Sequence, residues 1–365
     1  MSVETEMQQN NNAQQTTPQP QGTRLTTFRS VVLSVIIMAA AAVIIFTRNE
    51  QPEWDYDLDQ YLRIDPALII YEEACRVNTG LQKPRGIAIG QDDTLYVAGD
   101  NSVRIFDPAP LVTPAPTERE LPGPPRTEIE LTSPPQCVAV ADDGAIYVGM
   151  IDHVEVYGPD GARRAAWDNF GEKATLTSIA FSDGEVIVAD AGARAVLRCN
   201  RSGIVLARIG EKDKARNVDG IVAPSPHLDV ATAPDGLLRV TNPGRHRVEA
   251  YTCNGDLEFW WGKQSMTVGG FSGCCNPTDI AVLSDGSVVT GEKGLARIKV
   301  YEAVTGNFVG VVAGPEAFRE AAAHGIGPGF VGFDLAADSN DRVYVLDPGT
   351  KTVRIFTRKA KVSDD

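Results

Sequence analysis

The segment TDIAVLSDGSVVTGEKGLARIKVY, residues 278–301, carries the pattern from which the rest of the chain can be interpreted. A short apolar stretch is followed by a Ser-Asp-Gly turn, a second apolar stretch, the polar loop GEKG and a third stretch. Short runs rich in β-branched residues and separated by glycine-containing turns are typical of antiparallel strands. The segment therefore predicts three strands of one antiparallel sheet.

Five other segments repeat this pattern along the chain. Their spacings, in chain order, are 51, 41, 51, 50 and 55 residues, measured between the equivalent apolar positions Ile87, Val138, Ile179, Val230, Ile280 and Leu335. Repeats of this length, each holding several strands, indicate a β-propeller. The predicted fold is all-β, a six-bladed β-propeller over residues 61–357.

A fourth strand is predicted after five of the six units, in the stretches TEIEL, RAAWDNFG, IVLARIG, LEFWWG and FVGVVAG. The sixth unit lacks one. The stretch ALIIYEE, Ala67 to Glu73, is predicted to supply the missing strand. Such an exchange would close the ring and leave no unpaired edge in the last blade.

The region before the propeller has a different composition. Residues 1–29 are predicted to be a disordered tail, 30–47 a single transmembrane anchor, 48–60 an acidic linker, and 358–365 a C-terminal tail. Arg24 and Arg29 precede the apolar run, which favours a cytoplasmic N-terminus and a propeller on the periplasmic side of the inner membrane. A cleaved signal peptide is the alternative. The net charge of −14 argues against a nucleic-acid partner.

The first repeat, GIAIGQDDTLYVAGDNSVRIF at residues 86–106, resembles the NHL-repeat family of six-bladed propellers. The elements GCCNP and EKG look like those of an NHL subgroup in bacterial envelope proteins. The resemblance implies the fold and an envelope location. It implies no reaction, because propellers of this kind serve many functions.

Two loops of the fifth unit are predicted to form a site. GCCNP enters the first strand and TGEKG joins the second strand to the third, so both should emerge on the same face of the ring, near the central channel. The candidate ligand-binding residues are Cys274, Cys275, Asn276, Glu292 and Lys293. His227, in the loop that enters the fourth unit, is predicted to lie on the same face.

Three neighbouring units carry an aspartate just before the equivalent apolar residue, namely Asp229, Asp279 and Asp334. If these carboxylates faced the channel, their repulsion would need relief by a cation, an arginine or protonation. They are the candidate metal ligands, and a divalent cation such as calcium would suit oxygen donors. Alternatively, they bond to nearby backbone and have only a structural role.

The six cysteines leave several possibilities open. In an exported protein they could form disulfides. Cys274 and Cys275 could instead be free thiols, a strained adjacent pair, or ligands of a soft metal. The chain contains no CxxC motif, which weakens the metal interpretation.

The function predicted from these features is a membrane-anchored, extracytoplasmic module that binds a small ligand or a protein partner in an envelope complex. The alternative is a metal-dependent lyase or hydrolase, or a thiol-redox protein, that uses the cluster at the channel face. The sequence does not decide whether the chain is an enzyme.

Overall fold

The computed structural model describes residues 32–39, 59–107, 120–121, 124–318 and 332–360. The chain divides into two units, Met1–Asp57 and Leu58–Asp365. In the first unit, residues 32–39 form a helix. None of the helices in the described ranges is long and apolar enough to cross a membrane. The predicted N-terminal tail, nearly all of the linker and residues 361–365 of the predicted C-terminal tail lie outside those ranges, and the anchor stays a prediction.

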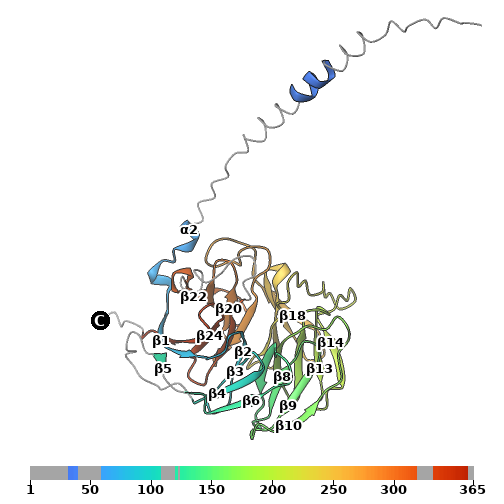
Figure 1. The fold of residues 1–365 in the computed structure, drawn as a ribbon, viewed down its shortest axis with the longest axis vertical. Coiled ribbons are helices and arrows are strands. Elements are labelled where there is room, and N and C mark those ends of the chain that lie inside the picture. The colour runs from blue at the N-terminus through green and yellow to red at the C-terminus, as the bar shows by residue number, and fades with distance from the viewer. Residues whose placement is uncertain (1–31, 40–58, 108–119, 122–123, 319–331, 361–365) are drawn as a thin grey trace, which may run out of the picture. The chain divides into compact units, whose positions relative to one another are not determined.

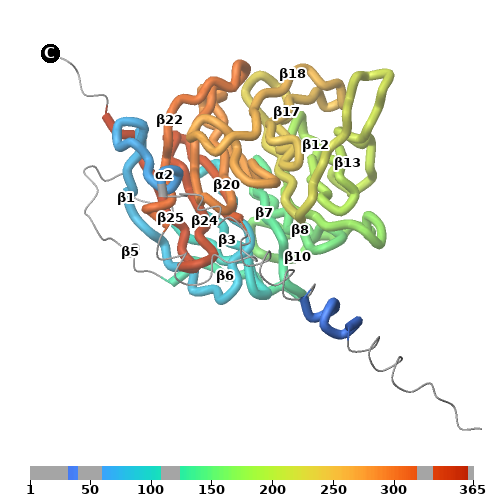
Figure 2. The backbone as a smooth tube through the Cα atoms, turned by 90° about the horizontal axis from the view of Figure 1, so that it is seen from above, coloured from blue at the N-terminus to red at the C-terminus, as the bar shows by residue number. Residues whose placement is uncertain are grey.

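The second unit is a six-bladed β-propeller, as Figures 1 and 2 show. The first blade contains β2 (Pro84–Ile89), β3 (Leu95–Gly99), β4 (Ser102–Phe106) and β6 (Thr127–Glu130). The second contains β7 (Cys137–Val140), β8 (Ile146–Gly149), β9 (Val154–Tyr157) and β10 (Arg163–Ala166). The third contains β11 (Leu176–Ser182), β12 (Glu185–Asp190), β13 (Ala195–Cys199) and β14 (Val205–Ile209).

The remaining blades follow the same order. The fourth contains β15 (Val230–Thr232), β16 (Leu238–Asn242), β17 (Arg247–Tyr251) and β18 (Leu257–Trp261). The fifth contains β19 (Asp279–Val282), β20 (Val288–Glu292), β21 (Arg297–Tyr301) and β22 (Phe308–Ala313). The sixth contains β23 (Asp334–Ala337), β24 (Val343–Asp347), β25 (Thr352–Arg358) and β1 (Tyr71–Asn78). These blades confirm the predicted fold class.

The hydrophobic core is divided among the blade interfaces. Each of six clusters of buried apolar side chains joins two neighbouring blades, and one of them contains Val248 and Trp261 of the fourth blade with Ile280 and Val288 of the fifth. Both faces of a blade are therefore buried. This explains why the inner strands have nearly continuous apolar runs.

The ring closes through the N-terminal strand of the propeller. β1 pairs antiparallel with β25, and Figure 2 shows the two strands side by side. Closure by an N-terminal strand was predicted, but the predicted bounds, Ala67 to Glu73, were wrong. The strand runs from Tyr71 to Asn78. Residues Pro66–Leu68 form a 3-10 turn, and the Ile70 N–H donates to Val311 O of the fifth blade. The short strand β5 (Glu120–Leu121) pairs in parallel with the outer edge of β1.

Candidate functional site

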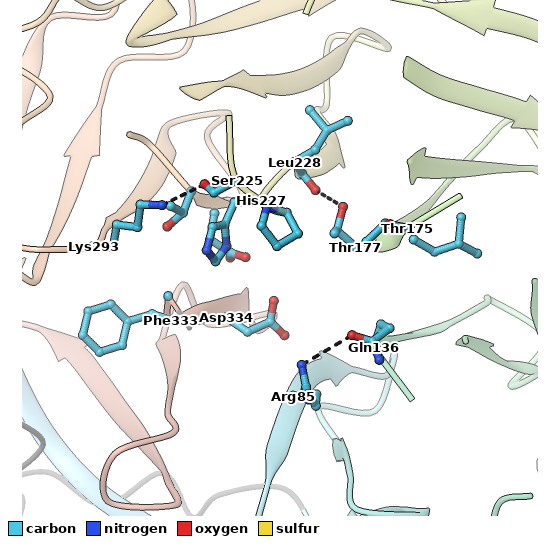
Figure 3. Close-up of a pocket in the computed structure, with 15 residues that line it drawn as sticks. Arg85, Gln136, Thr175, Thr177, Ser225, His227, Leu228, Lys293, Phe333 and Asp334 are labelled. Atoms are coloured by element: carbon cyan, nitrogen blue, oxygen red, sulfur yellow. Dashed lines mark hydrogen bonds between the residues drawn. The ribbon is translucent and has the colours of Figure 1, made fainter. Parts of the chain in front are cut away.

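A pocket of about 400 Å³ lies at one end of the central channel. All six blades contribute to its wall, and Figure 3 shows it. One residue from each blade, in chain order, is Arg85, Gln136, Thr177, His227, Lys293 and Asp334. These side chains come from the starts of the inner strands or from the loops of the same face. The pocket is therefore a property of the closed ring and of no single repeat.

The two loops of the fifth blade meet on this face. Asn276 joins them, because its Nδ2 donates to Ser272 O at 2.7 Å and to Lys293 O at 3.0 Å. The Lys293 N–H in turn donates to Asn276 Oδ1 at 2.9 Å. Asn276 is fully buried, so its amide holds the two loops in one arrangement. Its contacts are to backbone, and it does not line the pocket.

Lys293 lies at the boundary between the pocket and the two cysteines. Its ammonium donates to Ser225 Oγ at 2.8 Å, and Ser225 Oγ lies 3.7 Å from Cys275 Sγ. Burial opposes ionisation of the Cys275 thiol. Hydrogen bonds from Cys274, Lys293 and Ser225, together with the lysine charge, outweigh burial and lower its pKa below the usual value.

The sulfur atoms of Cys274 and Cys275 lie 3.1 Å apart. The hydrogen bond to Cys275 raises the pKa of Cys274, which is the exposed member of the pair. All six cysteines fall within the described ranges, and each is a free thiol. The structure thus contains none of the disulfides that were considered for this chain.

His227 lines the pocket beside Lys293, as Figure 3 shows. Burial, followed by the charge of Lys293, lowers the pKa of His227 to about 4. The imidazole is therefore neutral at neutral pH and can accept or donate a hydrogen bond. His246, on the same face, has its Nε2 3.0 Å from Gly273 O and so supports the cysteine loop.

Glu292 is not brought together with the other predicted site residues. Its side chain is fully buried in the fifth blade, where Oε1 accepts from the Ser272 N–H at 3.0 Å and from Lys299 Nζ at 3.1 Å. Burial lowers the pKa of Lys299 to about 8, despite the opposing charge of Glu292. The idea that Glu292 and Lys293 act together is therefore corrected. The Glu292 side chain lies in the blade interior, whereas the Lys293 side chain reaches the pocket.

The three aspartates lie around the channel, and each bonds to the next blade. Asp229 Oδ2 accepts from the Ile280 N–H at 2.6 Å, and Asp279 Oδ1 accepts from the Leu335 N–H at 2.8 Å. Asp334 accepts from the N–H of Ile87 in the first blade. The carboxyl groups thus link successive inner strands.

Asp229 and Asp279 are buried, and Asp334, which lines the pocket, is half-buried. Burial, with the charges of neighbouring aspartates, raises the pKa of Asp334 to about 7 and that of Asp279 well above its usual range. Burial alone raises the pKa of Asp229 to about 6, against the hydrogen bonds it accepts. Within the described ranges, no group of three or more His, Cys, Asp or Glu side chains has a geometry suited to a metal ion. Of the three means of relief that were considered, a cation, an arginine or protonation, the raised pKa values favour protonation.

Sequence reasoning did not single out Ser225 or Arg85. Ser225 lies two residues before His227 in the loop that enters the fourth blade, and this spacing was the available signal. Arg85 is the second residue of β2, and its Nη1 lies 3.5 Å from Gln136 Oε1 of the second blade. Its position at the pocket depends on ring closure and could not be seen in one repeat.

No protein-family model matches the chain, and the comparison with curated proteins found no match. Solved structures do resemble it. A catalytically inactive variant of virginiamycin B lyase from Staphylococcus aureus, solved with quinupristin, is 13% identical with a TM-score of 0.51, over 79% of this chain and 98% of that chain. A protein of unknown function from Bacteroides thetaiotaomicron is 14% identical with a TM-score of 0.50, over 76% of this chain and 70% of that chain. At these identities the likeness shows the fold alone, that of a six-bladed β-propeller.

Proposed function

We propose that this chain is a binding module of the NHL type, which holds a ligand or a segment of a partner protein in the channel-mouth pocket. The observation that carries the proposal is the pocket itself. It measures about 400 Å³, and every blade contributes to its wall. Small-molecule sites commonly have volumes of about 300 to 1,000 Å³. The pocket is thus suited to a small molecule or to one or two side chains of a partner.

The charges of the pocket favour an acidic group. Lys293 and Arg85 reach it from the fifth and first blades, and Figure 3 shows them on different sides of the cavity. The nearby carboxyl groups of Asp279 and Asp334 have raised pKa values, and protonation would reduce their negative charge. His227 is neutral. A carboxylate in the pocket could accept charge-assisted hydrogen bonds from Lys293 and Arg85.

We also propose that an N-terminal helix anchors the propeller to a membrane. The uncharged run from Val31 to Phe46, preceded by Arg24 and Arg29, supports a single N-terminal anchor with the propeller on the periplasmic side of the inner membrane. An anchored binding module could hold its partner in an envelope complex at the membrane. The resemblance of the GCCNP and EKG elements to those of envelope propellers supports the same role.

Photo-crosslinking in cells tests the binding role. A benzophenone amino acid at position 85 of the full chain should give adducts of defined mass, because that side chain lines the pocket. The control position is Arg201, which is exposed and pairs with Asp143 on the turn side of the blades away from the pocket. In the Lys293→Ala background, adducts from position 85 should fall severalfold. Equal yields from both positions, or no adducts from position 85, would contradict the proposal.

A further inference from the structure

Cys274 and Cys275 differ from the other cysteines in what surrounds them. Cys137 and Cys199 are buried among apolar side chains, and burial raises the pKa of both thiols. Cys274 is exposed, and its sulfur lies 3.1 Å from that of Cys275. Two sulfur atoms at this separation can exchange a proton, and only a small movement is needed for a bond between them.

The Lys293 ammonium favours the thiolate form of Cys275, the buried member of the pair. Cys275 is only 3% exposed. Ser225 Oγ donates to its sulfur at 3.7 Å and itself accepts a hydrogen bond from Lys293 Nζ at 2.8 Å. The Asn276 amide fixes the backbone of Lys293 against the cysteine loop. An ammonium beside a thiol favours the thiolate, which is the reactive form. The same ammonium repels a metal cation, so the surroundings favour thiol–disulfide exchange over metal binding.

We propose that Cys274 and Cys275 form a redox-active dithiol that reduces disulfides reaching the pocket face, with Cys274 as the entry thiol and Cys275 as the resolving thiolate. The division of roles follows from exposure, because only Cys274 is open to a disulfide from solution. It also follows from the position of Lys293, which favours the thiolate form of Cys275, the form that acts in the second step.

The chemistry balances with a disulfide RSSR as the oxidant. Cys274 passes its proton to Cys275 and attacks one sulfur of RSSR, so that the R–S–S–R bond breaks. The leaving thiolate takes the proton back from Cys275, which gives RSH and a mixed disulfide on Cys274. Cys275 thiolate then attacks the Cys274 sulfur and releases the second RS⁻, which takes a proton from water. The two cysteine sulfurs are oxidised, and RSSR is reduced to two thiols.

The test uses the full chain, purified in detergent, reduced, and treated with oxidised glutathione. Peptide mass spectrometry should find a Cys274–Cys275 disulfide in the parent chain. The Cys275→Ser variant lacks the resolving thiol and should accumulate glutathione on Cys274. Failure of both products to form, while Cys75 or Cys253 reacts, would overturn the proposal.

A second measurement separates the role of Lys293 from simple proximity of the two sulfurs. The Lys293→Gln variant should close the disulfide about tenfold more slowly at neutral pH, with its rate–pH profile moved to higher pH. Lys293→Arg should restore most of the rate, because it keeps the charge. The exposed Lys212 provides the control, and Lys212→Gln should react like the parent. An unchanged rate and profile in Lys293→Gln would overturn the assignment of the resolving thiolate.

Discussion

Asp279 lies between the carboxyl groups of Asp229 and Asp334 at the centre of the ring. It interacts with Asp334 and Asp229, and all three accept hydrogen bonds from backbone amides. The pKa of Asp229 is raised to about 6 and that of Asp334 to about 7, whereas an aspartate in an unfolded chain has a pKa of about 3.9. Protonation therefore favours the folded state. This contribution is complete below about pH 4 and is lost as the pH rises through 6 to 7.

Asp279→Asn should reduce the loss of stability between pH 5 and pH 8. The asparagine amide reproduces the shape and hydrogen bonding of a protonated carboxyl group, and it removes one ionisation from the cluster. The unfolding free energy of the variant should fall less over this interval than that of the parent, by about 1 to 3 kcal/mol. Denaturant titrations at both pH values measure the difference.

Asp160→Asn is the matched control, because Asp160 is exposed and pairs with Arg164. Its pH dependence should follow that of the parent. If Asp279→Asn kept the full pH dependence, ionisation of Asp279 would not contribute to the loss of stability.

Glu292 illustrates how a repeat position can be misread. It ends the second strand of its blade, as Asp190, Asn242 and Asp347 do in theirs. Asp190 and Asn242 accept hydrogen bonds from the loop that enters their own blade, and Glu292 does the same through Ser272. The repeat alignment already contained this signal. The unusual sequence GEKG drew the interpretation toward a functional role instead.

Glu292→Ala should therefore destabilise the protein. The substitution leaves Lys299 buried without its carboxylate, and breaking a buried pair commonly costs about 3 to 5 kcal/mol. The melting temperature of the variant should therefore fall clearly below that of the parent. Glu302→Ala, at an exposed turn of the same blade, should melt within a degree or two of the parent. Equal melting of the two variants would show that the buried pair contributes nothing.

At the scale of elements, β1 shows where sequence reasoning succeeded and where it failed. The absence of a fourth strand after β25 predicted that an N-terminal strand would close the ring. The apolar run ALII drew the prediction too far upstream. Ile69 and Ile70 extend onto β22 of the fifth blade, and the pairing with β25 uses YEEACRVN instead. In that strand Glu73 bonds to Arg354, an ion pair that no hydrophobicity pattern reveals.

Tyr71→Ala tests how much the closing strand stabilises the ring. Tyr71 is 1% exposed and packs in the cluster between the fifth and sixth blades. Removing a large buried aromatic side chain from a core commonly costs about 3 to 5 kcal/mol. Leu62→Ala, upstream of the strand and exposed, should change the unfolding free energy by less than about 0.5 kcal/mol. Chemical denaturation of both variants makes the comparison, and similar values would show that β1 adds little to stability.

At the scale of the molecule, the repeat spacing was enough to predict the ring and the face on which the fifth-blade loops meet. The pocket was only partly predictable. Lys293 and His227 reach it as expected of their loops. Arg85 and Ser225 could not be selected, because their positions depend on contacts between blades rather than on the period within the chain. Asn276 was selected, but its hydrogen bonds show a structural role.

The membrane topology is a prediction for the whole molecule. Protease added to cells with a permeabilised outer layer should digest the propeller, because the charges around the apolar run favour a periplasmic location. Immunoblotting against the propeller, with a cytoplasmic protein as the control for intact inner membranes, measures it. Protection of the propeller until the inner membrane is broken would contradict this topology.

The seam between β1 and β25 has a consequence for how the protein is made. Glu73 and Arg354, which bond across the seam, are 281 residues apart in the chain. At translation rates of about 5 to 20 residues per second, β1 emerges roughly 15 to 55 s before its partner strand. During that interval Tyr71 and Val77 have no sixth blade to cover them. In a newly made chain β1 therefore lacks its partner strand until residues 352–358 have been synthesised, and the ring cannot close before then.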